Sequence, residues 1–440
     1  MARISGVSGP VLTAEDPGYV TETAGFNTAA AHTPDVVVGI ESVEDAVAVV
    51  RHAQTRGQRI AIQATGHGNT AVTSGVLVTT RRLHNLDVDV ETRLATIGAG
   101  LRWGDVLQLA TKDGLFPVSG SSPNVGVVGY LLGGGLGPLA RSHGFSSDYL
   151  MGATVVTGTG EVVRATASES PDLLWALRGG KYGLGLVVDA TVRLVELRAL
   201  YGGSLTFDEP DIETALRAWV DWTPETDPRV TTSVAILRLP PLEFIPEPLR
   251  GRRVLNVRFA FPGAAAEGEQ LAAPLRAAAP VYLDALSEMP ADEVGQIHND
   301  PTQPGPSWVD GKLLRAIDQD FVTALLSSAA AGPQSPFVGV ELRQLGAATE
   351  VDVEGGSAAS GRGAAFTFAV IAVDPATFAT AAPDAAREVT RAVQGWVSSE
   401  KNINFSGDPR ALASTAWSPD VMARLADVRR RYDPDGLFAP

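Results

Sequence analysis

The chain has no cysteine among its 440 residues, which excludes disulfides, thiolate metal ligands and thiol nucleophiles. Histidine is also scarce. The six histidines form no His-x-x-x-His pair or comparable spacing, so we expect no metal site. No stretch reaches the roughly 18 apolar residues of a membrane span, and the first residues have no apolar run long enough for a signal peptide. We therefore expect a cytoplasmic protein with no membrane partner.

Positive charge is in the minority, with 35 Lys and Arg against 50 Asp and Glu and a formal net charge of −15. This balance argues against nucleic acid as a partner. What the chain does have is a hydrophobic content of 45% and a length sufficient for two or more domains. These values are ordinary for a soluble globular protein of the size of an enzyme, and they leave open whether it is a monomer or a homo-oligomer.

The order of the expected elements indicates an α+β fold whose character changes near residue 200. Before that point a strand over 35–39, a helix capped by Ser42 and ended by Gly57, and a strand from Ile60 form the first unit. A hairpin is expected over 154–163. Later, strand-like runs alternate with alanine-rich amphipathic helices, which predicts a second α+β domain with a mixed or antiparallel sheet. The expected strands there are 231–237, 253–261, 338–345 and 364–373, and the expected helices are 212–222, 267–278, 318–329, 383–398 and 420–432.

A glycine-flanked histidine follows the strand that begins at Ile60. The alternation of apolar residues runs directly into Thr65-Gly66-His67-Gly68. Glycine on both sides lets the backbone adopt unusual dihedral angles and approach a ligand closely. A histidine held at the end of a strand is a candidate for a reactive or ligand-bound imidazole. The alternative is a surface turn that happens to contain histidine.

A second unusual stretch, over 120–137, contains seven glycines interleaved with large apolar residues. Glycine this dense inside an apolar segment costs backbone entropy. Such a cost is expected where the backbone passes very close to something. That neighbour could be a ligand, or it could be another helix or strand of the same protein.

Four segments of this chain stand in an order that resembles a known family. Residues 41–67 are similar to a helix and a strand that ends in Arg-x-Gly-Gly-His, and residues 120–149 to a Gly-x-Cys-Pro-x-Val-Gly-Val-Gly-Gly-His segment with its Gly-Gly-Gly. Residues 178–187 are similar to Arg-Gly-Gly-Gly-Gly-Asn-Phe-Gly-Ile-Val, and residues 430–438 to an Arg-Tyr-Asp-Pro-x-x-x-Phe ending. The chain thereby resembles the bacterial berberine-bridge-enzyme-like FAD-linked oxidases of the vanillyl-alcohol-oxidase / p-cresol-methylhydroxylase superfamily. The resemblance is weak between about 200 and 400.

The resemblance implies a two-part FAD-binding domain over 1–200, an inserted α+β substrate domain over 201–400, whose sheet is covered by helices, and a C-terminal segment over 401–440 that returns to the FAD domain. His67 would carry a covalent bond to the 8α-methyl carbon of the flavin. The other residues that the resemblance places at FAD are Gln63, Thr65, Gly66, Gly68, Asn69, Ser121, Ser122, Val125, Gly126, Gly129, Tyr130, Val187 and Asn404.

The chain also departs from the family pattern. Many members attach FAD through both His and Cys, but the Cys position is Ser122 here, so any covalent link is through His67 alone. The arginine of Arg-x-Gly-Gly-His is Gln63, which removes a positive charge near the phosphates. The family's tyrosines on either side of Asn404 are Asn402 and Phe405. Some members use one of them as the catalytic base, so the base must come from elsewhere or is not needed.

The catalytic residues are not identified by the resemblance, and the candidates for a catalytic role are Tyr130, His298 and Asn404. Four further residues could line the substrate pocket, namely Trp308, Asp310, Glu341 and Arg343. Because Glu341 and Arg343 share one face of an expected strand, an ion pair on the outside is the favoured alternative for them. The histidines His32, His52, His84 and His143 are expected to be structural or solvated.

The activity that the resemblance implies is that of an FAD-dependent oxidase. A substrate C–H beside a hydroxyl or amine gives a hydride to the flavin, and O2 takes the electrons to form H2O2. The expected substrates are natural-product intermediates, alkaloid-like amines or sugars. Two alternatives remain. One is a dehydrogenase that uses another acceptor, and the other is a non-catalytic flavin-binding protein, which the residues at Asn402 and Phe405 favour.

Overall fold

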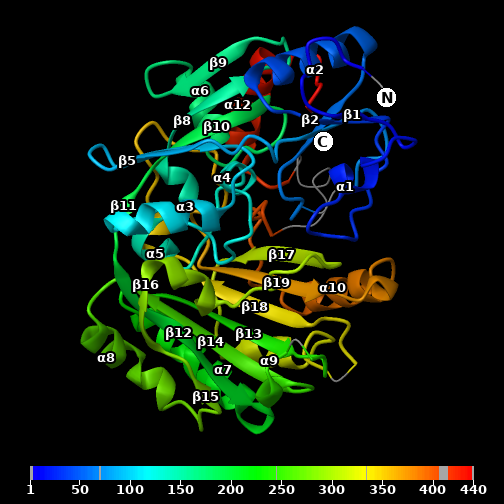
Figure 1. Ribbon diagram of the computed structural model, residues 1–440. Coiled ribbons are helices and arrows are strands. Elements are labelled where there is room, and N and C mark those ends of the chain that lie inside the picture. The colour runs from blue at the N-terminus through cyan, green and yellow to red at the C-terminus, as the bar shows by residue number, and fades with distance from the viewer. Residues whose placement is uncertain (1–2, 69–70, 244, 333, 406–414, 439–440) are drawn as a thin grey trace.

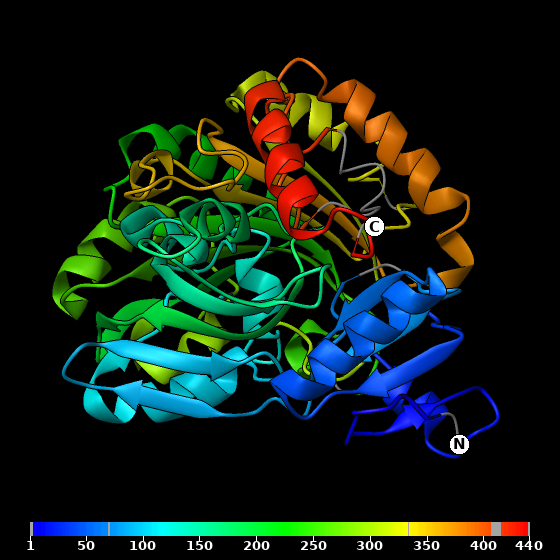
Figure 2. The same cartoon turned by 90° about the horizontal axis from the view of Figure 1, so that it is seen from above.

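The computed structural model describes residues 3–68, 71–243, 245–332, 334–405 and 415–438. Two halves lie one above the other in Figure 1. The N-terminal half comprises residues up to 198 together with α12 (Pro419–Tyr432), and the sheet half comprises residues 199–392. Figure 1 shows α12 (red) beside α6 and β10 of the N-terminal half although it follows α10 in the chain, and Figure 2 shows the same helix from above. Its Tyr432 carbonyl accepts a hydrogen bond from the Gly158 N–H, which lies between β8 and β9 of that half.

The first sheet of the N-terminal half has the order β1-β2-β4-β3, in which β2, β4 and β3 are parallel and β1 is antiparallel. Helix α2 (Val43–Arg56) packs on this sheet. The Ser42 hydroxyl accepts the Asp45 N–H at 3.1 Å and Gly57 ends the helix in the left-handed region, as the sequence predicts. The strands are β1 (Val11–Leu12), β2 (Val36–Gly39), β3 (Ile60–Gln63) and β4 (Val76–Thr79).

The second sheet of this half is antiparallel with the order β5-β6-β10-β8-β9. Its apolar face and four helices enclose one core. The pairing of β8 with β9 confirms the predicted hairpin. The strands are β5 (Leu86–Asp89), β6 (Leu94–Gly98), β8 (Leu150–Val156), β9 (Val162–Thr166) and β10 (Leu186–Arg193), and the helices are α3 (Trp103–Ala110), α4 (Val127–Leu131), α6 (Pro171–Leu177) and α12. Shorter elements are α1 (Tyr19–Thr23), α5 (Ala140–His143), β7 (Leu115–Phe116) and β11 (Val195–Glu196).

The sheet half is built on an antiparallel sheet of eight strands with the order β15-β12-β14-β13-β18-β19-β17, and with β16 also paired to β12. Four helices cover one face of it and share its core, as Figure 1 shows. The strands are β12 (Ala199–Asp208), β13 (Thr231–Arg238), β14 (Arg253–Phe261), β15 (Leu283–Asp284), β16 (Ser287–Pro290), β17 (Trp308–Leu314), β18 (Gly339–Gln344) and β19 (Phe366–Ala372), and the helices are α7 (Ile212–Trp222), α8 (Ala265–Arg276), α9 (Gln319–Leu326) and α10 (Ala381–Ala392).

Alternation along the strands decides what each face of the large sheet carries. Val257 and Phe259 of β14 and Leu342 of β18 point into the core beneath the helices. Arg258 lies between Val257 and Phe259, and Arg343 follows Leu342. Both arginines therefore point to the opposite face. The N-terminal half covers that face, so these charged side chains are buried.

The fold is α+β, as predicted. The strands and helices expected after residue 200 are all present, but β12, β15, β16 and β17 are additional. The domain limits at residues 200 and 400 stay a prediction. None of the helices in the described ranges is long and apolar enough to cross a membrane.

Candidate active site

His67 lies in the turn that follows β3. Its Nδ1 is 2.8 Å from the Thr65 hydroxyl, and its ring stacks on the ring of Phe26 with 3.9 Å between centroids. The Nε2 atom is buried and has no hydrogen-bond partner among the described residues. One nitrogen of the ring is therefore committed to the protein, and the other is left for a group outside it.

The electrostatic setting of His67 keeps its ring neutral. Burial lowers the pKa of His67 to about 4, and the positive charge of Arg102 acts in the same direction. A neutral imidazole has a lone pair on the nitrogen that carries no proton. The ring can therefore act as a nucleophile or ligand at neutral pH.

Residues 25–28 run alongside this turn and form hydrogen bonds with its backbone. The Phe26 and Asn27 N–H groups donate to the carbonyls of Thr65 and Gly66, each at 2.9 Å. Gly66 has φ +70°, and a Cβ there would overlap the Cα of Gly25. Sequence reasoning missed Phe26, because no local pattern shows that residues 40 positions apart form one turn.

Gln63 and Thr65 also support this turn. The Gln63 side chain is buried, and its amide donates to the Thr23 and Ala24 carbonyls at 3.2 Å. The Thr65 hydroxyl also accepts the Gly126 N–H at 3.3 Å, which links the turn to the start of α4. A contact of Gln63 or Thr65 with FAD stays a prediction, and Asn69 lies outside the described residues.

The glycines of 120–137 divide into two groups. A Cβ at Gly133 would overlap Asn404, and one at Gly137 would overlap the Ser119 carbonyl, so close packing within the protein accounts for these positions. By contrast, a Cβ at Gly129, or at Gly68 across the turn, would meet no atom within 4 Å. Open space therefore faces the backbone at Gly68 and Gly129, two of the positions where the resemblance expects the cofactor.

Tyr130, Asn404 and Lys181 form a connected group. The Asn404 amide donates to the Tyr130 carbonyl at 3.0 Å, and its Oδ1 accepts the Lys181 amine at 2.7 Å. The Tyr130 hydroxyl is buried without a partner among the described residues, and burial raises the pKa of Tyr130 above its ordinary value. Lys181 was not identified from the sequence. Burial lowers its pKa to about 8, and its φ of +54° is in the left-handed region.

The remaining predicted cofactor residues occupy several environments. Ser121 donates from its hydroxyl to Asp300 at 2.7 Å, which ties the glycine-rich segment to the sheet half. Ser122 is buried, and the Val125 carbonyl accepts the Trp103 N–H at 3.1 Å. Val187 is buried in the core beneath the five-stranded sheet. Contacts of these residues with FAD stay predictions.

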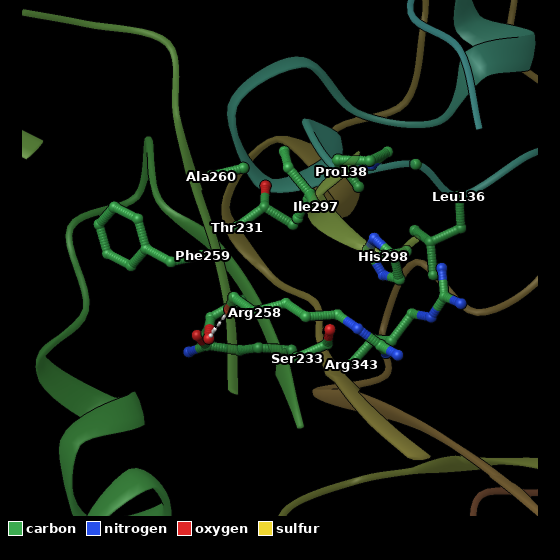
Figure 3. Close-up of a pocket in the computed structure, with 14 residues that line it drawn as sticks. Leu136, Pro138, Thr231, Ser233, Arg258, Phe259, Ala260, Ile297, His298 and Arg343 are labelled. Atoms are coloured by element: carbon green, nitrogen blue, oxygen red, sulfur yellow. Dashed lines mark hydrogen bonds between the residues drawn. The ribbon is translucent and has the colours of Figure 1, made fainter. Parts of the chain in front are cut away.

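A small cavity lies between the large sheet and the loop after α4. Figure 3 shows His298, Arg258 and Arg343 on its wall, with Leu136 and Pro138 opposite. Glu341 accepts from Arg258 through Oε1 and from Arg343 Nε through Oε2, the latter at 2.7 Å. All three side chains of this ion group are buried.

The prediction that Glu341 and Arg343 form an ion pair is confirmed, but an outside position is wrong. They share a face, as period-two alternation requires, and the N-terminal half covers that face. The Arg343 guanidinium lies 4.8 Å from the ring of Phe405, next to Asn404, so the ion group borders the predicted flavin region. Asp310 instead pairs with Lys312 at 2.6 Å, and Trp308 stacks on Phe337.

The histidines expected to be structural include two whose Nδ1 atoms are engaged by hydrogen bonds within the protein. His143 Nδ1 is 2.7 Å from the Ser142 hydroxyl, and His32 Nδ1 accepts the Val72 N–H at 3.1 Å. His298 differs from both. Its two ring nitrogens are buried, and neither has a partner among the residues that the structure describes.

Comparison with known proteins agrees with this geometry. Residues 34–166 match the FAD binding domain family. The chain is 27% identical to (R)-6-hydroxynicotine oxidase of Paenarthrobacter nicotinovorans over 98% of its own length and 95% of that protein. A shorter match, over 49% of this chain and 45% of the relative, is 30% identical to glucooligosaccharide oxidase of Sarocladium strictum. The crystal structure of 6-hydroxy-D-nicotine oxidase from Arthrobacter nicotinovorans has a TM-score of 0.83 and 24% identity, with 98% and 96% of the two chains covered.

The fold and the matched segment define the class of protein. The architecture is the α+β fold of the p-cresol-methylhydroxylase and berberine-bridge-like oxidases. The matched segment and the sequence relatives support the superfamily of FAD-linked oxidases, and the protein is an FAD-linked oxidoreductase. The resemblance read from the sequence is confirmed at this level.

Proposed function

We propose that the chain is an FAD-dependent oxidase that holds its flavin covalently through Nε2 of His67 alone. Its substrate is a small molecule oxidised at a C–H beside a hydroxyl or amine. The observation that carries the proposal is the His67 ring, whose Nδ1 is engaged by Thr65 while Nε2 is buried without a partner among the described residues. A buried polar atom left unsatisfied is costly, and a bond to the cofactor removes that cost.

The surrounding residues fit FAD. The open positions at Gly68 and Gly129 leave room for a bound group against exposed backbone. The hydroxyl of Tyr130 is a buried donor without a partner in the described structure, and it suits a flavin or ribityl oxygen. When bound, FAD supplies the hydride acceptor, and O2 reoxidises it with formation of H2O2.

The chain's own residues hold the ring of His67 in place. Phe26 stacks on the imidazole, Thr65 fixes its Nδ1, and burial keeps it unprotonated at neutral pH. The ion group of Arg258, Glu341 and Arg343 provides fixed charges on the sheet side of the site. Fixed polar groups in a site shielded from water orient a substrate without reorganising during reaction.

The relatives' names suggest two substrate classes to test, cyclic amines and sugars. The experiment offers (R)-6-hydroxynicotine and maltotriose to the purified holoprotein without oxygen, and the visible flavin band is followed. Under air, peroxide is then measured for any compound that bleaches the band. We expect bleaching and a matching yield of peroxide with one of the two classes.

The outcomes separate the alternatives. Rapid bleaching without peroxide would favour a dehydrogenase with another acceptor. A flavin that bleaches with dithionite but with neither substrate class would contradict the proposed oxidation of these classes and favour a flavin-binding protein without catalysis. Protein that carries no flavin after expression with riboflavin would contradict the proposal altogether.

A further inference from the structure

The cavity between the large sheet and the loop after α4 is unusual in the number of unsatisfied polar atoms around it. Four atoms of its lining residues are buried without a hydrogen-bond partner in the described structure. They are the two ring nitrogens of His298, the Ser233 hydroxyl and Nε of Arg258. Buried polar groups are nearly always paired in native proteins, so a cluster of exceptions calls for an occupant.

The sheet register explains how these groups come together. Ser233 on β13 lies directly opposite Arg258 on β14 and opposite Arg343 on β18. The three side chains therefore form a row across neighbouring strands on the face that the N-terminal half covers. Serine in the middle of the row is short, which leaves space between the two longer side chains. His298, at the end of the 3-10 helix Ala291–Ile297, closes this space from the side.

The charges around the cavity balance. Arg258 and Arg343 carry two positive charges, Glu341 accepts from both, and Asp300 acts on Arg343 electrostatically. Burial, with the charges of the two arginines, lowers the pKa of His298 well below its ordinary value, so its ring is neutral. Neither a carboxylate nor an ammonium would find an uncompensated opposite charge here.

The unsatisfied atoms include donors and acceptors together. A neutral imidazole presents one of each, a hydroxyl presents both, and Arg258 Nε donates. The enclosed space admits about one water molecule, which is the size of a single hydroxyl group. A group that both donates and accepts a hydrogen bond can therefore pair with the unsatisfied donors and acceptors that line the cavity.

We propose that this cavity is a specificity subsite that receives an uncharged hydroxyl of the substrate, through His298 and Ser233. The inference rests on the proposed function, because it names the class of molecule that the oxidase takes: hydroxyl-bearing compounds rather than carboxylates or simple hydrophobic amines. A site built to hydrogen-bond a hydroxyl rejects an analogue that lacks it, because its own buried polar groups are then left unpaired. The neighbouring Arg343, against Phe405, connects the subsite to the predicted flavin region.

The test measures the binding of four fragments of similar shape to the holoprotein by calorimetry: phenol, benzoate, benzylamine and toluene. Phenol is expected to bind most tightly. In Ser233→Ala, which removes one hydroxyl and little volume, phenol affinity is expected to fall about fivefold to tenfold, while toluene affinity stays the same. His298→Phe keeps the ring and removes both nitrogens, and it is expected to have a similar or larger effect.

Matched controls are Ser142→Ala and His143→Phe, which alter a serine and a partly buried histidine outside the cavity. Neither is expected to change phenol affinity. Tighter binding of benzoate or benzylamine than of phenol would overturn the proposal, as would equal binding of all four fragments, the result expected if the cavity only holds an internal water. Ser233→Ala with unchanged phenol affinity would also overturn it. Because the fragments need no turnover, failure of the proposed oxidase activity leaves these affinities readable.

Discussion

Replacement of Glu341 tests how much the buried ion group on the large sheet stabilises the fold. Glu341 is 6% exposed, and its carboxylate accepts from both Arg258 and Arg343. Glu341→Gln keeps the shape but removes the charge, so two buried guanidiniums lose the carboxylate that accepts from both of them. Breaking a buried ion pair by removing one partner costs about 3–5 kcal/mol. We expect a loss of this size in the free energy of unfolding, measured by urea unfolding at pH 7.

The matched control is Glu267→Gln, which breaks an ion pair with Arg229 in which both side chains are about half exposed. Exposed pairs contribute little, so we expect no measurable change. The reasoning would be refuted if Glu341→Gln and the control unfolded at the same urea concentration as the unmodified protein.

The pH dependence of the Glu341 effect follows from its ionisation. Burial raises the pKa of Glu341, but the charges and hydrogen bonds of Arg343 and Arg258 outweigh burial and hold the pKa below the ordinary value of 4.5. The folded state therefore binds the proton less readily than the unfolded state, so this stabilisation is complete above pH 4.5 and is lost as the pH falls below it. The stability gap between the unmodified protein and Glu341→Gln should narrow in that range.

Three further substitutions test residues that support the predicted flavin site. Gly66→Ala imposes a left-handed φ on alanine and an overlap with Gly25, and we expect a loss of about 1–3 kcal/mol in stability together with lower flavin content, read from thermal unfolding and the visible spectrum. Gly133→Ala should displace Asn404 and remove its charged hydrogen bond, at about 1.5–3 kcal/mol, and unchanged urea unfolding would contradict this. Burial lowers the pKa of Lys181 to about 8, so the stability of the unmodified protein relative to Lys181→Met should rise between pH 8 and 10.5; a flat difference would be the contrary result.

Local signals in the sequence predicted the elements that depend on neighbours along the chain. The serine cap and glycine end of α2 and the alternation of β14 belong to this group, because capping and side-chain periodicity act within a few residues. Strand β12 was missed because Gly202 and Gly203 interrupt its pattern. Gly203 has φ +130°, and a side chain there would overlap the Ala285 carbonyl, so these glycines serve a contact with a distant segment.

The candidate site could be predicted only in part. The turn at His67 and the glycine-rich segment were found because each is a continuous motif. The stacking of Phe26 on His67, and the bonds from Glu341 to Arg258, join residues that are far apart in the chain. The sequence predicted that Glu341 and Arg343 share one face of a strand. It did not predict that the N-terminal half covers this face, because tertiary packing decides which face of the sheet is buried.

The central claim is that His67 alone holds the flavin, and acid precipitation tests it most directly. The purified protein is denatured in acid, and the pellet is examined by its visible spectrum and by mass spectrometry. We predict that the unmodified protein and the control His143→Ala retain the flavin, with a mass higher by that of one FAD, and that His67→Ala releases it. Complete release of free FAD from the unmodified protein would contradict the claim.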